Sequence, residues 1–379
     1  MTRSHGMAAQ ALGRWRGRLR ELAGACSGGG RSGGIRLAPR PVLLALAALL
    51  AGAFALSLAS GAVPLGVGQV LAALAQPLGL TLPWAIGPQD AGVVLGLRLP
   101  RALLAVLTGS GLAVSGAALQ ALFRNPLADP ALLGVSGGAA FFAAGAIVLG
   151  GTLFGTAPSP HVLPACAFLG ALLATAIVWR CAQAGGRTVT GLMLLAGLAL
   201  NALAGAGTGL LTFIATDAQL RSLTFWSLGS LAGATRGVVA GVAPFLLVAL
   251  LLLLRSAGAL NALLLGEAEA GHLGLDVKRL TRRIVAASAL AAGASVAAAG
   301  MIGFVGLLAP HLLRVLLGPD HRALLPGSAL LGAALLLLAD VLARTVVAPA
   351  ELPIGILTAL VGAPAFLALL LRRRADWGA

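Results

Sequence analysis

Few side chains in this sequence have the type and spacing that catalysis or cofactor binding needs. There is no Tyr, and the single lysine, Lys278, is not in the Gly-rich loop with which a Walker A motif binds ATP. The five histidines show no HExxH pattern and no i, i+4 pair, and the three cysteines form no CxxC motif, so no metal site is predicted. We expect a protein that is not an enzyme and binds no cofactor in this chain.

Ionisable residues are almost absent from the interiors of the apolar stretches, which contain Gly, Ala, Ser and Thr instead. A charge within the bilayer is costly and marks an ion-coupled pathway, whereas small residues favour close helix packing. The pattern indicates a translocation path whose energy source lies in another protein. The acidic residues at or near the ends of these stretches are Asp129, Glu267, Glu269, Asp276, Asp320, Asp340 and Glu351.

The composition is that of an integral membrane protein. The chain is 59% hydrophobic and only 10% charged, whereas soluble domains carry about 25% charge. Strand-like alternation is absent, and the apolar runs are long enough for helices that cross a bilayer. The predicted fold is all-α, a polytopic membrane protein with about ten transmembrane helices. The expected spans are 42–60, 99–122, 131–150, 162–182, 189–214, 237–255, 284–300, 302–317, 324–347 and 353–371.

The apolar stretch 284–317 is predicted to form two spans rather than one. As a single helix its 34 residues would be about 50 Å long, too long for one crossing. Basic residues flank both ends, and both groups favour the cytoplasm, which requires an even number of crossings. Glycines at 300, 303 and 306 allow the chain to reverse between the two short helices.

The positive charge is distributed so as to set the orientation in the membrane. The net charge is +15, and with both termini in the cytoplasm 21 of the 26 Lys and Arg residues lie on that side. We therefore do not expect a nucleic acid partner. Residues 1–40, with eight arginines and a Gly/Ser run, are predicted to be a disordered cytoplasmic tail that lies against membrane lipid. Residues 41–372 form the expected transmembrane domain, and 373–379 a short cytoplasmic tail.

Two segments have the character of interaction surfaces. Residues 260–280 mix polar and apolar side chains on the cytoplasmic side and are expected to form two short helices broken at Gly271 and Gly274. An ordinary connecting loop is the alternative. On the outer side, Arg98, Arg101 and Arg344 lie at span ends and together predict a positive patch for an acidic soluble partner. Arginines that reach individually to lipid headgroups are the alternative there.

Four blocks of sequence resemble the permease subunits of ABC importers for iron-siderophores, haem and vitamin B12, which are type II importers. The similarity covers roughly residues 42–371 and excludes the arginine-rich tail. The blocks are RLPRALLAVLTGSGLAVSGAALQALFRNPLADPALLGVSGGA at 98–139, LNALLLGEAEAGHLGLDVKRL at 260–280, IGFVGLLAPHLLRVLLGPDHRALLP at 302–326 and LLLLADVLARTVVAPAELPIGILTALVGAPAFLALLL at 335–371.

This resemblance implies the type II ABC importer permease fold, assembled as a homodimer in the bacterial inner membrane. Two cytoplasmic ATPase subunits that bind ATP and Mg would lie below the homodimer, and a periplasmic substrate-binding protein above it. It also implies roles for particular residues. Arg98, Arg101 and Arg344 would grip acidic residues of the binding protein. The segment that couples to the ATPase would contain Glu267, Glu269, His272, Leu273, Gly274 and Leu275, and the cytoplasmic gate Asn125, Leu127 and Thr190.

Alternatives remain at the gate and for the substrate. Asn125 could form a turn with Pro126, and Thr190 could cap a helix. The stretch 195–235 most resembles haem permeases, with siderophore or cobalamin permeases as alternatives. Two other classes compete with the importer subunit: a stand-alone secondary transporter, which predicts charges in mid-span, and a membrane enzyme, which needs a nucleophile paired with a base.

Overall fold

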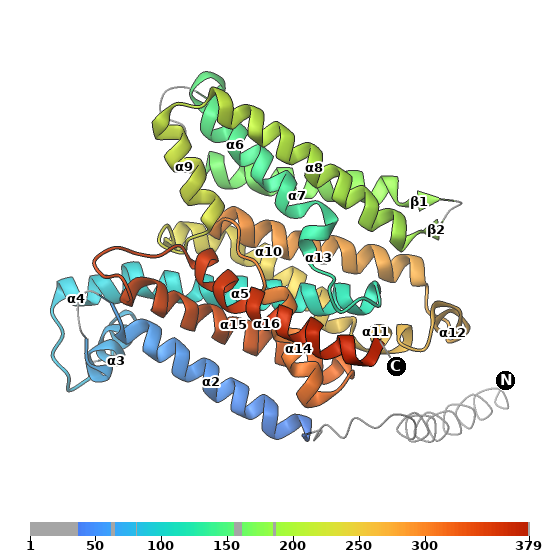
Figure 1. Cartoon of the computed structure of the whole chain (residues 1–379). Helices are drawn as coiled ribbons and strands as arrows, with labels where there is room; N and C mark the ends of the chain where they lie inside the picture. The colour runs from blue at the N-terminus through green and yellow to red at the C-terminus, as the bar shows by residue number, and fades with distance from the viewer. Residues whose placement is uncertain (1–36, 62–64, 81, 155–160, 185–186, 378–379) are drawn as a thin grey trace, which may run out of the picture. The chain divides into compact units, whose positions relative to one another are not determined.

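The computed structural model describes residues 37–61, 65–80, 82–154, 161–184 and 187–377 of the chain (Figure 1). Residues 37–379 belong to one compact unit. Within the described ranges the regular structure is helical apart from a two-residue antiparallel pair, β1 (Gln183–Ala184) and β2 (Arg187–Thr188). The all-α prediction is confirmed. Most of the expected 1–40 tail lies outside the described residues.

Eight helical segments in the described ranges are long and apolar enough to cross a membrane, and two shorter apolar helices bring the number to the predicted ten. The eight are α2 (Pro39–Ala59), Pro88–Leu122, α6 (Val135–Phe154), α7 (Val162–Cys181), α8 (Thr190–Ile214), α10 (Arg236–Arg255), α13 (Val277–Ala299) and α15 (His321–Thr345). The shorter two are α14 (Val305–Leu317) and α16 (Ile354–Trp377), whose apolar part is Ile354–Ala368.

The largest differences between the helix ends and the predicted ones are in three places. The second span begins at Pro88 because α4 (Pro88–Val93) and a π-helical turn, η2 (Val94–Arg98), continue directly into α5 (Leu99–Leu122). Helix α13 begins at Val277, so its basic residues form its first turns rather than a preceding loop. Helix α16 continues through 373–377, where a separate tail was expected.

Short elements connect the spans. On the chain between α2 and α4 lie α3 (Val67–Ala75) and the 3-10 turn η1 (Gln76–Leu78), and the 3-10 turn η3 (Pro130–Leu133) precedes α6. Helix α9 (Asp217–Leu228) follows α8, with Thr216 and Gln219 forming a reciprocal capping box at its start. Helices α11 (Ala257–Leu263) and α12 (Glu267–His272) occupy the predicted coupling segment.

The reversal within 284–317 is where the glycines predicted it. Helix α13 ends at Ala299, and Gly300 has φ +69°, a left-handed conformation that ends the helix. A side chain at Gly300 would also meet the carbonyl of Trp226. Helix α14 then has 13 residues, about 20 Å, which is shorter than the hydrocarbon core of a bilayer. Two helices therefore replace one long span, as predicted, but only α14 is short, because α13 has 23 residues.

Helix α5 lies at the centre of the bundle and packs against α15, α13, α14 and α10 (Figure 1). In the most apolar stretch of its span 83% of the residues are buried, against 17% in α8 and α10, which lie at the periphery. The backbones of α5 and α15 touch at Gly109 and Gly332, where each glycine lies against the other's carbonyl. Small residues thus bring the two helices into direct contact, as is common in membrane bundles.

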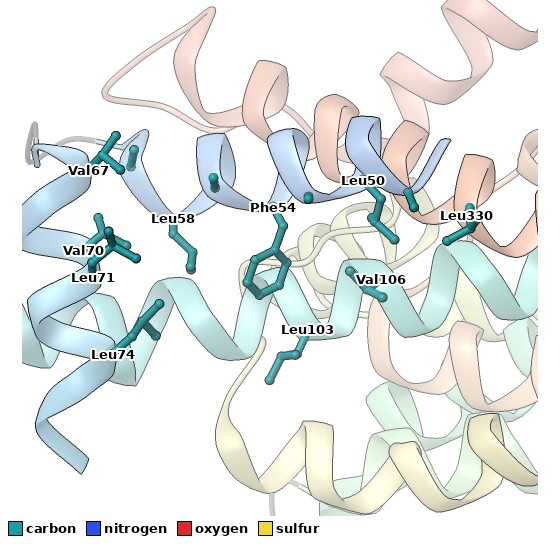
Figure 2. Close-up of a pocket in the computed structure, with 14 residues that line it drawn as sticks. Leu50, Phe54, Leu58, Val67, Val70, Leu71, Leu74, Leu103, Val106 and Leu330 are labelled. Carbon is teal, nitrogen blue, oxygen red and sulfur yellow. The ribbon is translucent and has the colours of Figure 1, made fainter. Parts of the chain in front are cut away.

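An apolar hollow of about 510 Å³ lies between α2, α3 and α5 (Figure 2). Phe54 extends from α2 toward α5, and Leu103 and Val106 line the facing side. The α3 side is closed by Val70 and Leu74. Helix α2 packs mainly against α15, so this hollow marks a looser contact between α2 and α5.

Candidate functional site: two ends of one helix pair

An ion network joins α5 and α15 near the predicted outer end of the bundle. Arg101 donates from Nε to Asp340 Oδ1 at 2.8 Å and from Nη1 to both Glu351 carboxylate oxygens at 2.9 and 3.0 Å. Arg344 Nε lies 3.3 Å from the other oxygen of Asp340. Asp340 is completely buried, and it is compensated by the two guanidinium groups.

The other two predicted docking arginines bind the carboxyl end of α2. Arg98 donates from Nη1 to the carbonyls of Leu58 and Ala59 at 2.8 and 2.9 Å. Arg344 donates to the carbonyls of Ser57 and Ser60 at 2.8 and 3.0 Å. Because the last carbonyls of a helix have no intrahelical donor and carry partial negative charge, two cations at this end are favourable.

The three arginines do gather in space, but they do not form the exposed patch that the sequence predicted. The side chains of Arg344 and Arg101 are 7% and 12% exposed, and Arg98 as a residue is 5% exposed. The physical reason is that each guanidinium group is turned toward carboxylates or carbonyls inside the subunit, to which it donates hydrogen bonds. Their docking role stays a prediction.

Sequence reasoning missed the acidic partners in this network. Asp340 and Arg344 are four residues apart on one helix, which places them on the same face. That spacing, together with a carboxylate inside an apolar run, was a usable signal. Nothing in the local sequence indicated that Arg101 would pair with Asp340 and Glu351, because those contacts join segments about 240 residues apart.

The predicted coupling residues lie on and just after α12. Glu267, Glu269 and His272 are exposed, whereas Leu275 packs partly against the core. Both glutamates lie in the first turn of α12, where negative charge complements the helix dipole. The helix therefore presents a polar outer face.

Of the two predicted breaks in this segment, the one at Gly274 is present and the one at Gly271 is not. The first break is at Gly266, which has φ +132° and ends the turn after α11. Gly271 continues α12, and Gly274, with φ +80°, lies in the turn before α13. Gly266 is required at its position because a side chain there would be strained and would meet the Glu269 carboxylate.

Asn261 joins α11 to the start of α15. Its Oδ1 accepts from the backbone N–H of His321 at 2.8 Å and lies 2.9 Å from the Nδ1 of the same residue, while its amide donates to Asp320 Oδ1 at 2.6 Å. A second contact runs from Arg124, just after α5, to the carbonyl of Leu263 at 3.2 Å. The coupling segment is thus fastened to both α5 and α15. Sequence reasoning did not single out Asn261.

The three predicted gate residues have different local structural roles. Asn125 Oδ1 accepts from the N–H of Leu127 at 2.9 Å, so Asn125 does form the turn that was its alternative role. Leu127 itself is 40% exposed. Thr190 is the first residue of α8 and not its cap, because Val189 occupies that position without a capping side chain. The capping alternative for Thr190 is wrong.

Thr190 and Glu267 line the same hollow of about 540 Å³, which is bounded by the end of α5 and the starts of α8, α12 and α13. Its other polar lining residues are Thr188, Lys278 and Thr281. A predicted gate residue and a predicted coupling residue therefore face one space.

Asp129 ends the turn that follows α5 and begins η3. Its Oδ1 accepts from the N–H of Ala131 at 2.9 Å, as an N-cap does. Desolvation raises the pKa of the Asp129 carboxyl, and the Ala131 N–H opposes this shift to a smaller degree. This carboxylate is a local structural group that faces Gly306 of α14.

The polar side chains described above form contacts between helices. Among the described residues no three His, Cys, Asp or Glu side chains come together as a metal site requires. The polar groups instead fasten helices to one another at the two ends of α5 and α15. Such contacts can hold helices in one arrangement and be exchanged in another.

Comparison with known proteins agrees with this description. Residues 49–372 match the FecCD transport family. The hemin transport system permease protein HmuU of Yersinia pestis is 47% identical over 302 residues, which cover 77% of this chain and 87% of that protein. The cobalamin import system permease protein BtuC of Halobacterium salinarum is 41% identical over 351 residues, covering 88% and 90%.

A solved structure shares the fold. It is an inward-facing metal-chelate type ABC transporter, matched with a TM-score of 0.77 and 34% identity over 88% of this chain and 99% of that one. Sequence and fold therefore agree over most of the helical bundle. The chain belongs to the FecCD transport family and is a multi-pass membrane permease of the ABC importer type.

Proposed function

We propose that this chain forms the translocation pathway of an ATP-driven importer for an iron-containing chelate, with haem as the favoured substrate. Haem is favoured because the chain is 47% identical to a protein named as a hemin permease. The near absence of charged side chains from the mid-span regions supports a passive, weakly binding conduit.

The proposed assembly contains two copies of the chain in the bacterial inner membrane, with both termini in the cytoplasm. Two ATPase subunits, which bind ATP and Mg, contact α12 and the following turn. A periplasmic substrate-binding protein docks at the outer arginine cluster. The pathway closes on the cytoplasmic side near Asn125, Leu127 and Thr190. The exposed acids of α12 and the shared hollow at Thr190 support these positions.

The test is uptake into liposomes that contain this chain with its ATPase subunits and substrate-binding protein. We expect ATP-dependent accumulation of haem and none when ATP is replaced by ADP. Parallel assays with a ferric siderophore and with cobalamin identify the substrate. Concentrative uptake by the chain alone would contradict the proposal and support a stand-alone transporter.

Cobalamin is the second candidate, because the 41% identical BtuC protein covers a larger share of the chain than HmuU does. The two candidates predict different growth phenotypes. Loss of the chain should abolish growth on haem iron if haem is the substrate. Growth that depends instead on limiting cobalamin would favour the second candidate.

A further inference from the structure

The outer arginine cluster contains its own carboxylates. Asp340 and Glu351 pair with Arg101, and Asp340 also lies 3.3 Å from the Nε of Arg344. Arg101 and Arg344 are therefore paired with acidic groups of the same chain. A docking partner that offers a carboxylate to Arg101 must displace one of these groups to gain an ion pair.

Glu351 is the carboxylate that can be exchanged. Its side chain is 42% exposed, whereas that of Asp340 is 1% exposed. Glu351 lies in the connection between α15 and α16, which also contains the exposed residues Val346 and Val347. It binds the Nη1 of Arg101 through both oxygens, so it occupies the side of the guanidinium that points away from the core.

We propose that Glu351 is a built-in competitor that occupies Arg101 in the undocked permease and is displaced by a carboxylate of the docking protein. This inference rests on the proposed function, since it needs an acidic partner at the outer face. Asp340 holds Arg101 through Nε at 2.8 Å, so the guanidinium stays in place when Glu351 leaves. One carboxylate replaces another, and Arg101 remains paired throughout.

The exchange has a kinetic consequence. When the partner's carboxylate loosens, Glu351 is positioned to rebind Arg101 and so speeds release of the docked protein. A competitor of this kind lowers affinity mainly through the dissociation rate. General attraction between the charged surfaces acts mainly on the association rate.

The test compares Glu351→Gln with Asp217→Asn, in the permease assembled with its ATPase subunits in lipid nanodiscs. Asp217 is an exposed acid of α9 on the same predicted side of the membrane, so each variant removes one negative charge. Binding of the importer's own substrate-binding protein is followed by biolayer interferometry at low and high salt. Thermal unfolding of each variant verifies its fold.

We expect Glu351→Gln to slow dissociation by about two- to fivefold, the effect of removing a partly exposed ion pair that competes. Asp217→Asn should change only the association rate, and high salt should remove that change. Equal dissociation rates for Glu351→Gln and the wild type, or faster release by the variant, would overturn this inference alone. If the wild type does not bind the substrate-binding protein at all, the docking part of the proposed function fails and this inference fails with it.

Discussion

At the scale of single residues, Asp340 is a buried negative charge between Arg101 and Arg344. We expect Asp340→Ala to lower the free energy of unfolding by about 3–5 kcal/mol, because it leaves two largely buried guanidinium groups without their shared partner. Thermal unfolding in detergent measures the change.

The control is Asp217→Asn on the surface of α9, for which the free energy of unfolding should change by no more than about 0.5 kcal/mol. Equal effects of the two variants would mean that water already compensates the arginines.

Asp129 gives a pH-dependent prediction, because burial raises the pKa of its carboxyl in the folded protein. As pH rises from the ordinary Asp pKa toward this raised value, the unfolded chain ionises before the folded one, so stability is lost over that interval. Asp129→Asn keeps the oxygen that caps η3 and removes the titration. The variant's melting temperature should therefore exceed the wild type's by a margin that grows with pH above about 4. A margin independent of pH would show that Asp129 titrates normally.

Sequence reasoning identified individual residues better than their partners. It placed Arg98, Arg101 and Arg344 at one end of the bundle, and the structure does bring them together. It named Asp340 and Glu351 as acids near span ends but did not pair them with Arg101 and Arg344. Ion pairs between distant segments depend on which helices pack together, and hydropathy does not carry that information.

At the scale of elements, the contact between α5 and α15 leaves no space at Gly109. A methyl group there would meet the carbonyl of Gly332, a backbone atom that cannot rotate away. Gly109→Ala should therefore destabilise the protein by about 1–3 kcal/mol through overpacking. Gly145→Ala in α6 is the matched control, because nothing lies within 4 Å of its added methyl group. It should be neutral or stabilising by up to about 1 kcal/mol. If Gly109→Ala also unfolds at the wild-type temperature, the two helices are less closely packed than described.

The hydrogen bonds that Asn261 makes with Asp320 and His321 predict an effect on coupling rather than on assembly. Asn261→Ala removes the contacts from α11 to Asp320 and His321, so movement of α12 should pass less effectively to α15. In the reconstituted importer we expect ATP hydrolysis to continue while uptake per ATP falls several-fold.

The control for the Asn261 experiment is Asn201→Ala. Asn201 also joins two elements through both amide atoms, by bonds to Ala131 and Gly137, but it lies away from α12. A similar loss of stability with normal uptake per ATP is expected for that variant. If both variants retain normal coupling, Asn261 is only a structural contact.

The spans could be predicted because their apolar length is set by the bilayer. The split at Gly300 followed from the same argument combined with charge. Helix ends were harder to predict from the sequence, since α4 joins α5 through a π turn and α13 extends over basic residues that hydropathy assigns to a loop. Helix α9 was not predicted, because its 12 residues are too few and too polar to appear as a span.

At the scale of the whole molecule, the two predicted contact sites lie at opposite ends of one helix pair. Helix α5 begins near Arg101 and is followed by Arg124, which contacts α11. Helix α15 begins at the hydrogen bonds with Asn261 and ends at the ion network of Asp340 and Arg344. These helices share a close backbone contact between the two ends. An event at the docking surface and one at the ATPase surface can therefore act on the same rigid pair, which the sequence alone could not show.

The orientation of this pair in the membrane can be tested with a native thiol. Cys181 is exposed at the end of α7, on the side where the charge distribution predicts cytoplasm. With Cys26 and Cys166 changed to Ser, a membrane-impermeant maleimide should label Cys181 in inside-out vesicles and not in intact spheroplasts. A variant with Cys181→Ser and Gly233→Cys marks the opposite side of the membrane. Position 233 is exposed and unobstructed between α9 and α10, so the new cysteine should be labelled only in spheroplasts. Labelling of Cys181 in intact spheroplasts would invert the topology. The arginine cluster would then face the cytoplasm and α12 the periplasm, and neither proposed partner could reach its surface.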